Sequence, residues 1–186
     1  MLIRKPVVVV VAVLALAGCS GSSSKASTPT TVTPTIPPIT STTTVIPAID
    51  PCTLLTAQDA TQLIGKTVKR TPVVGTGGVT ACTYAAGTSG GAEITVKVDA
   101  NAKAAHDEFP AWVQPIPGVA AGLTVASVPN LGNEASSTHN LNVNDGIYVR
   151  RGATLVKIGA YPAVGDAALL AAAKTALARL RASGQV

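Results

Sequence analysis

Cys19 is the residue whose type and position most clearly predict a chemical reaction. It ends the sequence Leu16-Ala17-Gly18-Cys19, directly after an apolar run at residues 7–17. Small residues before a cysteine let the segment enter a peptidase site, and the cysteine thiolate is the nucleophile that accepts a diacylglycerol group. This order predicts a lipoprotein processing site with Cys19 as the lipid-bearing residue. A signal peptide cut elsewhere, or an uncleaved anchor, is the alternative.

Cys52 and Cys82 are the two remaining cysteines of the chain. They form an even pair in a chain that we expect to be exported, and disulfides form and persist outside the cytosol. We therefore interpret them as one structural disulfide. The sequence has no CxxC motif and no cysteine and histidine cluster with zinc spacing. A reactive or metal-binding pair nevertheless stays open as the alternative.

Ser89 lies in the only stretch that matches a nucleophile motif, Gly87-Thr88-Ser89-Gly90-Gly91. The G-x-S-x-G elbow requires a strand that runs through a sharp turn into a helix. The residues that follow Gly91 alternate in the manner of a strand, which favours a hairpin turn instead. No spacing supports a triad with His139. The sequence therefore predicts no catalytic residues, and an unrecognised hydrolase is kept only as an alternative.

The other ionisable clusters have simple structural explanations. His106-Asp107-Glu108 would point in different directions on a helix, because groups that converge need spacings of three or four residues. We therefore expect a solvated helix face there, and the same for the isolated His139. Residues 140–146 lack the closing glutamate of a calcium loop. We expect neither a metal nor a cofactor.

Arg150, Arg151 and Lys157 are the residues that we predict as a possible interaction surface. They could cluster on the outer face of the last predicted hairpin and contact anionic lipid head groups or a partner. The alternative is a solvated strand edge, protected by its charges against pairing with another strand.

The distribution of charge argues against nucleic-acid binding. Three of the 14 lysines and arginines precede residue 50, so 11 basic residues face all 9 acidic ones from Asp50 onward. The resulting formal charge of +2 leaves no basic stripe with interleaved aromatic residues. We therefore expect no nucleic-acid partner.

The chain divides into three parts by composition. Residues 1–18 carry Arg4 and Lys5 before an apolar run that is too short for a membrane span of about 20 residues, so they are predicted as a signal peptide. Residues 19–49 are dominated by Ser, Thr and Pro, with Lys25 as the only charge, and predict a disordered tether behind the lipidated cysteine. Residues 50–184 are predicted to form a single domain.

Hydrophobic periodicity predicts the elements of that domain. Thr56 and Asp59 have capping-box spacing before a helix at 57–64, and Gly65 suits its end. Asn101 can cap a second helix to about 109, after which Pro110 is expected to end it, and Asp166 is expected to cap a last helix of about 17 residues. Strands with a period of two are predicted at 79–86, 92–99, 123–128, 137–143, 147–151 and 154–161.

The order of these elements predicts the fold class. It is roughly α-β-β-α-β-β-β-β-α, which is typical of an α+β domain. We expect an antiparallel sheet packed on one face by helices and pinned by one disulfide. The second face of the sheet is expected to be partly polar and solvated.

Several landmarks together resemble a known family of small actinobacterial lipoproteins, the Lpr-type mycobacterial proteins with a domain of unknown function. They are the Cys19 box with its Thr/Pro-rich tail, Asp50-Pro51-Cys52-Thr53-Leu54-Leu55-Thr56, Cys82-Thr83-Tyr84, Leu131-Gly132-Asn133-Glu134-Ala135 and the closing Ala-rich helix. The resemblance covers residues 50–183, with Asn133 where an aspartate is expected. It implies a cell-envelope location and a Cys52–Cys82 bridge, and it brings no catalytic residues.

These observations lead to one functional hypothesis and two alternatives. The protein is expected at the outer face of the cytoplasmic membrane, attached by a lipid on Cys19, as a non-enzymatic domain that binds an envelope protein or a cell-wall component. The first alternative is a carrier that holds a lipid or another apolar ligand between the sheet and the helices. The second is the hydrolase considered above.

Overall fold

The computed structural model describes residues 49–88, 90–114, 122–140 and 144–184. The described residues belong to one compact unit within residues 43–186. The predicted signal peptide, Cys19, nearly all of the predicted tether and Ser89 lie outside the described residues. Within the described ranges, no helix is both long and apolar enough to cross a bilayer.

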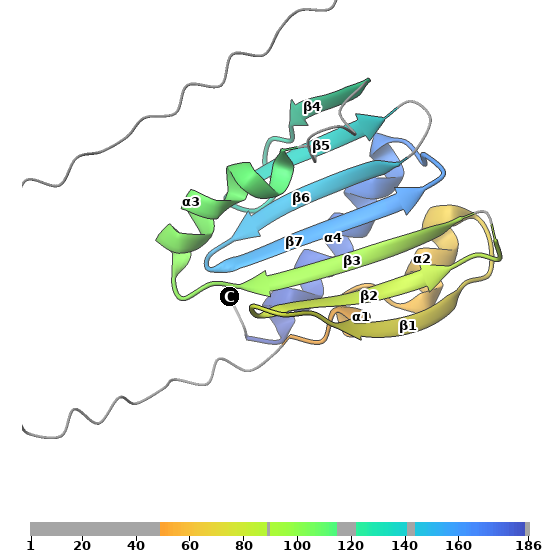
Figure 1. The fold of residues 1–186 in the computed structure, drawn as a ribbon, viewed down its shortest axis with the longest axis horizontal. Coiled ribbons are helices and arrows are strands. Elements are labelled where there is room, and N and C mark those ends of the chain that lie inside the picture. The colour runs from red at the N-terminus through yellow and green to blue at the C-terminus, as the bar shows by residue number, and fades with distance from the viewer. Residues whose placement is uncertain (1–48, 89, 115–121, 141–143, 185–186) are drawn as a thin grey trace, which may run out of the picture. The chain divides into compact units, whose positions relative to one another are not determined.

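Seven antiparallel strands form one sheet in the order β1-β2-β3-β7-β6-β5-β4 (Figure 1). Two meanders make up the sheet, and they meet where β3 pairs with β7. The strands are β1 (Lys69–Val74), β2 (Val79–Ala85), β3 (Gly91–Val98), β4 (Leu123–Ser127), β5 (Glu134–Asn140), β6 (Asp145–Arg151) and β7 (Thr154–Tyr161).

Four helices accompany the sheet: α1 (Pro51–Leu54), α2 (Ala57–Ile64), α3 (Ala102–Val113) and α4 (Asp166–Ala182). The predicted limits of α2 are confirmed. Thr56 and Asp59 form a reciprocal capping box, and Gly65 ends the helix in the left-handed conformation with φ 72°. The predicted α+β class and the predicted order of elements are also confirmed.

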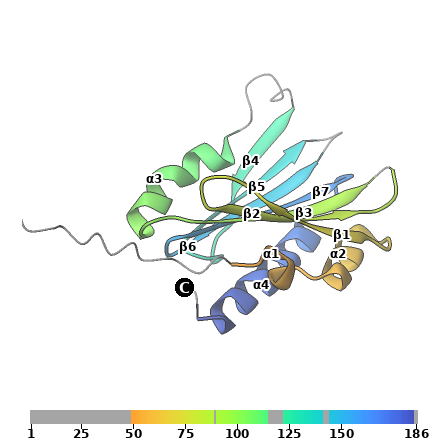
Figure 2. The same ribbon diagram turned by 60° about the horizontal axis from the view of Figure 1, so that its bottom comes forward.

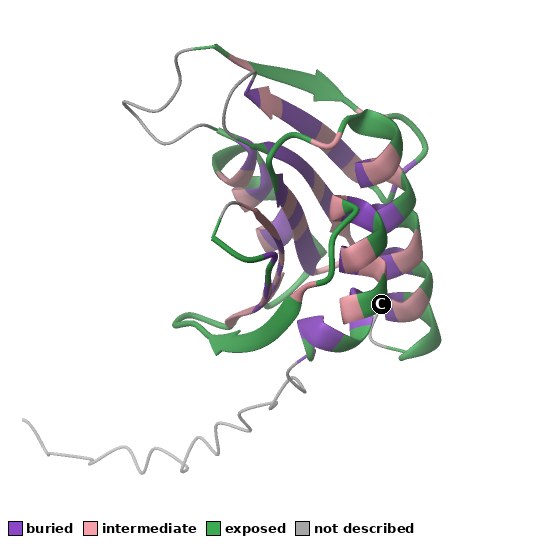
Figure 3. Ribbon diagram, turned by 90° about the vertical axis from the view of Figure 1, so that its right-hand side faces the viewer, coloured by how far each residue is buried: buried purple, intermediate pink, exposed green. Residues whose placement is uncertain are grey.

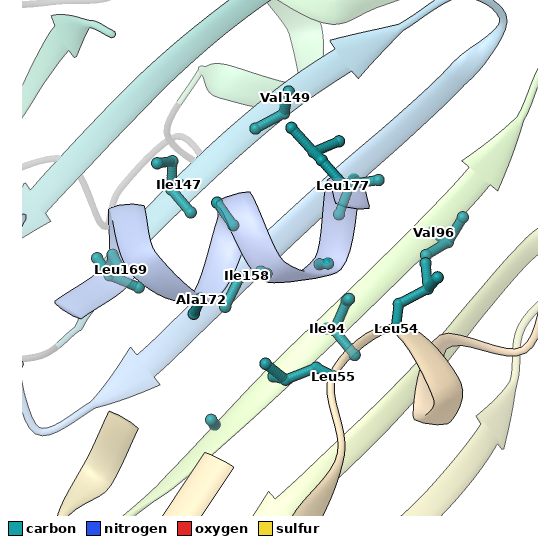
Figure 4. Packing of buried hydrophobic residues seen from close by; sticks show 14 of the residues in the cluster. Leu54, Leu55, Ile94, Val96, Ile147, Val149, Ile158, Leu169, Ala172 and Leu177 are labelled. Atoms are coloured by element: carbon teal, nitrogen blue, oxygen red, sulfur yellow. The ribbon is translucent and has the colours of Figure 1, made fainter. Parts of the chain in front are cut away.

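Helices α1, α2 and α4 pack on one face of the sheet and bury the main core (Figures 2 and 4). Alternate residues of the strands face these helices. Figure 3 shows that buried residues lie along the central strands, whereas the edge strands β1 and β4 are largely exposed. Burying each large side chain there contributes about 1.5–3 kcal/mol. The fully buried members of this core include Leu54, Leu55, Ile94, Ile147, Ile158, Leu169 and Leu180.

Helix α3 lies on the opposite face, which corrects the expectation that all helices share one face (Figure 2). Its apolar stripe of Ala105, Phe109 and Val113 packs on Leu155 of β7. The reason is topological. The connection from β3 in the middle of the sheet to β4 at its far edge crosses this second face, and an apolar stripe on that connection is buried there.

Pro110 does not end α3, contrary to prediction, because the helix continues to Val113. A proline in a helix interior costs about 3 kcal/mol. Burial of Phe109 and Val113 offsets this cost, and Trp112 Nε1 donates a hydrogen bond to Glu108 Oε1 at 2.9 Å. Trp112 therefore belongs to the last turn of the helix.

Two short elements were not predicted. Strand β1 is exposed along its whole length and contains Pro72. Because no residue of this strand is buried, its sequence does not need to alternate between apolar and polar residues, and it does not. Helix α1 has only four residues, but its Asp50 cap accepts a hydrogen bond from the Cys52 amide at 2.9 Å. Neither element carries a periodic signal that pattern analysis can detect.

Candidate ligand-binding groove

The disulfide is confirmed between Cys52 of α1 and Cys82 of β2. Their Cα atoms lie 5.2 Å apart, and both residues are buried, at 4% and 0% exposure. The bond ties the shortest helix to the sheet within the main core. Its position supports a structural role rather than a reactive or metal-binding one.

The structure does not bring Arg150, Arg151 and Lys157 together in one cluster. Strand alternation puts Arg150 and Lys157 on the face that carries α3, whereas Arg151 points to the other side of β6. Arg150 is also withdrawn from solvent, because its Nη2 donates a hydrogen bond to Glu134 Oε1 at 2.7 Å. Of the three residues, Lys157 lines a hollow on the α3 face of the sheet, and Arg151 lines a separate pocket beside Gly132 and Asn133.

Two ionic clusters fasten α3 to the sheet. Glu134 contacts both Arg150 and His106, and the hydrogen bond from Arg150 lowers the pKa of the Glu134 carboxyl. Glu108 pairs with Lys97, whose hydrogen bond likewise lowers the pKa of Glu108. The expected solvated face is confirmed for His106 and Asp107, which are both exposed, but His106 also contacts Glu134, and Glu108 is partly buried beside Lys97. Sequence spacing could not reveal this, since both partners come from distant strands.

His139 is not isolated, because two carboxylates flank its ring. Its Nδ1 lies 3.0 Å from Asp145 Oδ1, and its Nε2 lies 2.5 Å from Asp166 Oδ1. Asp145 Oδ2 also accepts hydrogen bonds from the Val164 and Gly165 amides, at 3.0 and 3.1 Å. Asp166 was predicted to cap α4, but it is the first residue of this helix and a partner of His139. Gly165 occupies the N-cap position, and no side chain caps the helix there.

The His139 contacts make stability depend on pH. Burial lowers the pKa of His139, but the Asp145 hydrogen bond and the Asp166 charge outweigh it and raise the pKa above its usual value. The added stability is present below the unfolded-state pKa of about 6.5 and is lost as pH rises through the raised folded-state pKa. From about pH 6 to pH 8.5, the wild type should lose more stability than His139→Gln. Urea unfolding of both proteins at each pH measures this, and equal losses would contradict it.

The most distinct hollow among the described residues lies on the open part of the α3 face. It has a volume of about 440 Å³. One cross-strand row forms its floor, and strand register places Thr83, Glu93, Gly159, Gly146 and Thr138 side by side in that row. Since the two central residues have no side chains, the middle of the row is lower than its ends. We call this feature the glycine groove.

Aromatic and basic side chains border the glycine groove. Lys157 and Tyr148 occupy the next row toward α3, and Lys157 Nζ lies 6.0 Å from the centre of the Tyr148 ring. Tyr161 lies at the opposite border and is 48% exposed. In Figure 1, α3 crosses the left part of this face, and no described helix covers the right part of β3, β7 and β6. The groove is therefore open to a ligand from solvent.

The groove holds both a carboxylate and an ammonium group. Glu93 Oε1 accepts a hydrogen bond from Thr95 Oγ1 at 2.9 Å. Lys157 stands two residues from Gly159, the partner of Glu93 in the neighbouring strand. Across the ranges that the structure describes, neither Glu93 nor Lys157 makes an ion pair. Both charged groups are thus available to a bound molecule.

The G-x-S-x-G sequence lies in a hairpin connection, as predicted. This stretch connects the antiparallel strands β2 and β3, and the Ala86 amide donates to the Gly90 carbonyl at 2.8 Å. A hairpin connection lacks the helix that follows a nucleophile elbow. In the described part of the chain, no three His, Cys, Asp or Glu residues are grouped to hold a metal ion.

The fold and the groove define a small α+β domain whose second sheet face is partly open. The chain belongs to the family described as "Protein of unknown function (DUF3558)", whose model matches residues 14–167. This match confirms the expected domain of unknown function. Comparison with curated proteins and with solved structures found no match for the chain.

Proposed function

We propose that this protein is a non-enzymatic binding domain of the cell envelope, held by a lipid on Cys19 at the outer face of the cytoplasmic membrane. The glycine groove is the observation that carries the binding role. Its volume of about 440 Å³ falls in the range of small-molecule sites, and its border combines aromatic side chains with a few polar groups. The partner is an envelope protein or a cell-wall component that presents a small group to the groove.

The sequence before the domain supports the anchored location. The Leu16-Ala17-Gly18-Cys19 order follows a short apolar run, and the Ser/Thr/Pro-rich residues 20–49 would hold the domain away from the lipid surface. The family assignment is compatible with this location. The Ala-, Gly- and Val-rich composition fits an actinobacterium with a high-GC genome, and the Lpr type rests on the sequence resemblance.

An apolar carrier receives less support than a binding domain. The space between the sheet and α1, α2 and α4 is filled by side chains such as Leu55, Ile94 and Leu180, each 0% exposed. An acyl chain would have to displace them. The glycine groove is on the other face and contains Glu93 and Lys157, whose charges disfavour a purely apolar ligand.

Site-specific photocrosslinking in the native envelope tests the binding role. A benzophenone amino acid at position 161 should capture a partner, because Tyr161 borders the groove and is half exposed. The same group at position 74 is the control, since Val74 is 87% exposed but lies on the edge strand β1.

Adding Gly159→Val should abolish the adduct at position 161 by filling the floor of the groove. No adduct at position 161, or equal adducts at positions 161 and 74, would contradict the binding role.

Replacing Cys19 with alanine tests the anchor. Without the thiol no diacylglycerol can be attached, so Cys19→Ala should lose acylation and move from the detergent phase to the aqueous phase. Metabolic labelling with a fatty-acid analogue and Triton X-114 partitioning measure both effects. Unchanged partitioning would mean that residues 7–17 anchor the chain themselves.

A further inference from the structure

The glycine groove has features that define the chemical class of its ligand, provided that it is the binding site proposed above. We propose that it binds a saccharide unit carrying a carboxylate. Lys157 pairs with the carboxylate, Glu93 accepts hydrogen bonds from hydroxyl or amide groups, and the sugar ring lies on the glycine floor beside Tyr161.

The location of the groove argues against an extended peptide. It lies on a sheet face and not at a sheet edge, and β3, β7 and β6 are paired with strands on both sides. Their backbone amides and carbonyls are consequently occupied within the sheet. A peptide that binds by strand addition needs free backbone groups at an edge. Recognition in this groove has to use side chains instead.

The side chains around the groove suit a hydroxylated ring. Thr83 and Thr138 at the ends of the floor and the two tyrosines at its borders carry hydroxyl groups, which both donate and accept hydrogen bonds. Tyrosine also offers a flat apolar ring beside its hydroxyl. A sugar presents the same combination, with C–H groups on the faces of its ring and hydroxyls around its rim.

The glycine floor provides room for such a ring. A Cβ atom built on Gly159 would meet only the Asp145 carbonyl oxygen, at 3.8 Å. The backbone of Gly159 does not require a positive φ, so its lack of a side chain is not a conformational need. At Gly146 a Cβ would come within 3.0 Å of Thr138 Oγ1 and 3.3 Å of Tyr148 Cε2. The floor is thus free above Gly159 and closely bordered at Gly146.

Lys157 supplies the preference for an anion. Its ammonium group is half buried beside the Tyr148 ring and has no carboxylate partner among the described residues. A bound carboxylate would gain a charge-assisted hydrogen bond there. Glu93 lies on the neighbouring strand β3, opposite Gly159, which is two residues from Lys157. Its charge disfavours a second negative group on the ligand and favours hydroxyl or amide donors near Glu93.

The test compares methyl β-D-glucuronide with methyl β-D-glucoside, which share one ring and differ in the carboxylate. Binding to the full-length chain in detergent micelles is followed by isothermal titration calorimetry at low salt. The glucuronide should bind about tenfold more tightly than the glucoside. Lys157→Gln should remove this difference by lowering the affinity for the glucuronide to about that for the glucoside. Lys174→Gln, an exposed site on α4, controls for net charge and should keep the difference.

Gly159→Val and Tyr161→Ala should each weaken both sugars, with thermal unfolding confirming that the variants are folded. No heat from millimolar glucuronide, equal affinity for the two sugars, or equally tight binding of acetyl-dialanine would overturn the proposal. If the crosslink at position 161 persists while the glucuronide fails, only the ligand class is wrong. If that crosslink is absent, the proposed function itself is wrong.

Discussion

Replacing Cys52 and Cys82 together with alanine is expected to lower the free energy of unfolding by roughly 3 to 4 kcal/mol. The bond joins residues 30 positions apart, and closing a loop of that length removes a corresponding amount of entropy from the unfolded chain. Both cysteines are buried, so the loss of packing adds to the effect. Stabilities of 5–15 kcal/mol are typical for single domains, and this loss is a large fraction of them.

The measurement is urea unfolding of wild type and the double variant, with a fall in melting temperature of about 10–15 °C as the second readout. Reduction of the wild type should give most of this loss, because it opens the bond but leaves both cysteine side chains in the core. Free thiols at Cys52 and Cys82 in untreated wild type, or a melting temperature that reduction does not change, would contradict a structural disulfide.

Replacing Asp59 with alanine is expected to destabilise the domain by about 2–3 kcal/mol. Asp59 caps α2 by accepting hydrogen bonds from the Thr56 amide and hydroxyl, at 2.7 and 2.6 Å. It also accepts two hydrogen bonds from Arg179 of α4. Arg179 in turn donates to the Leu54 carbonyl at 2.8 Å, so one carboxylate connects the ends of α1, α2 and α4.

The same carboxylate should govern stability in acid. Burial raises the pKa of Asp59, but the hydrogen bonds from Arg179 and Thr56 outweigh it and lower the pKa to about 2. The depressed folded-state pKa means that this stability is present above about pH 4 and is lost as pH falls toward 2. The effect amounts to about 2 kcal/mol at most, because Arg179 is partly exposed.

Unfolding by urea at about pH 6 and pH 3 tests the Asp59 prediction. Asp59→Asn keeps the size of the side chain and should show a weaker loss of stability in acid than the wild type. Arg179→Met should also destabilise the domain, whereas Arg181→Met, an exposed site nearby on α4, should have little effect. If Arg179→Met and Arg181→Met behave alike, the connection through Asp59 is not important for stability.

Patterns that are local in sequence predicted most of the fold. The limits of α2 follow from the Thr56–Asp59 box and Gly65, and the period of two in residues 92–98 identifies β3. Each of these signals lies within one turn of helix or one strand. The disulfide was predictable because only two cysteines remain after Cys19 and the chain is expected to be exported.

Elements without such signals were missed. Strand β1 has no buried residue, and α1 is too short to show a period. Pro110 predicted a helix end, yet burial of Phe109 and Val113 carries α3 through it. Tertiary packing contributes more here than the local preference of one residue.

The sequence by itself determined the α+β class and the disulfide pair and predicted a lipidation motif and a tether, because each depends on composition or on residues close together in the chain. Only the tertiary structure decided that α3 covers the second face, that His139 meets Asp145 and Asp166, and that Arg150 is an internal ion-pair partner. It alone also revealed the glycine groove. Gly146 and Gly159 become neighbours through strand register, and register between strands is set by the packing of the whole sheet.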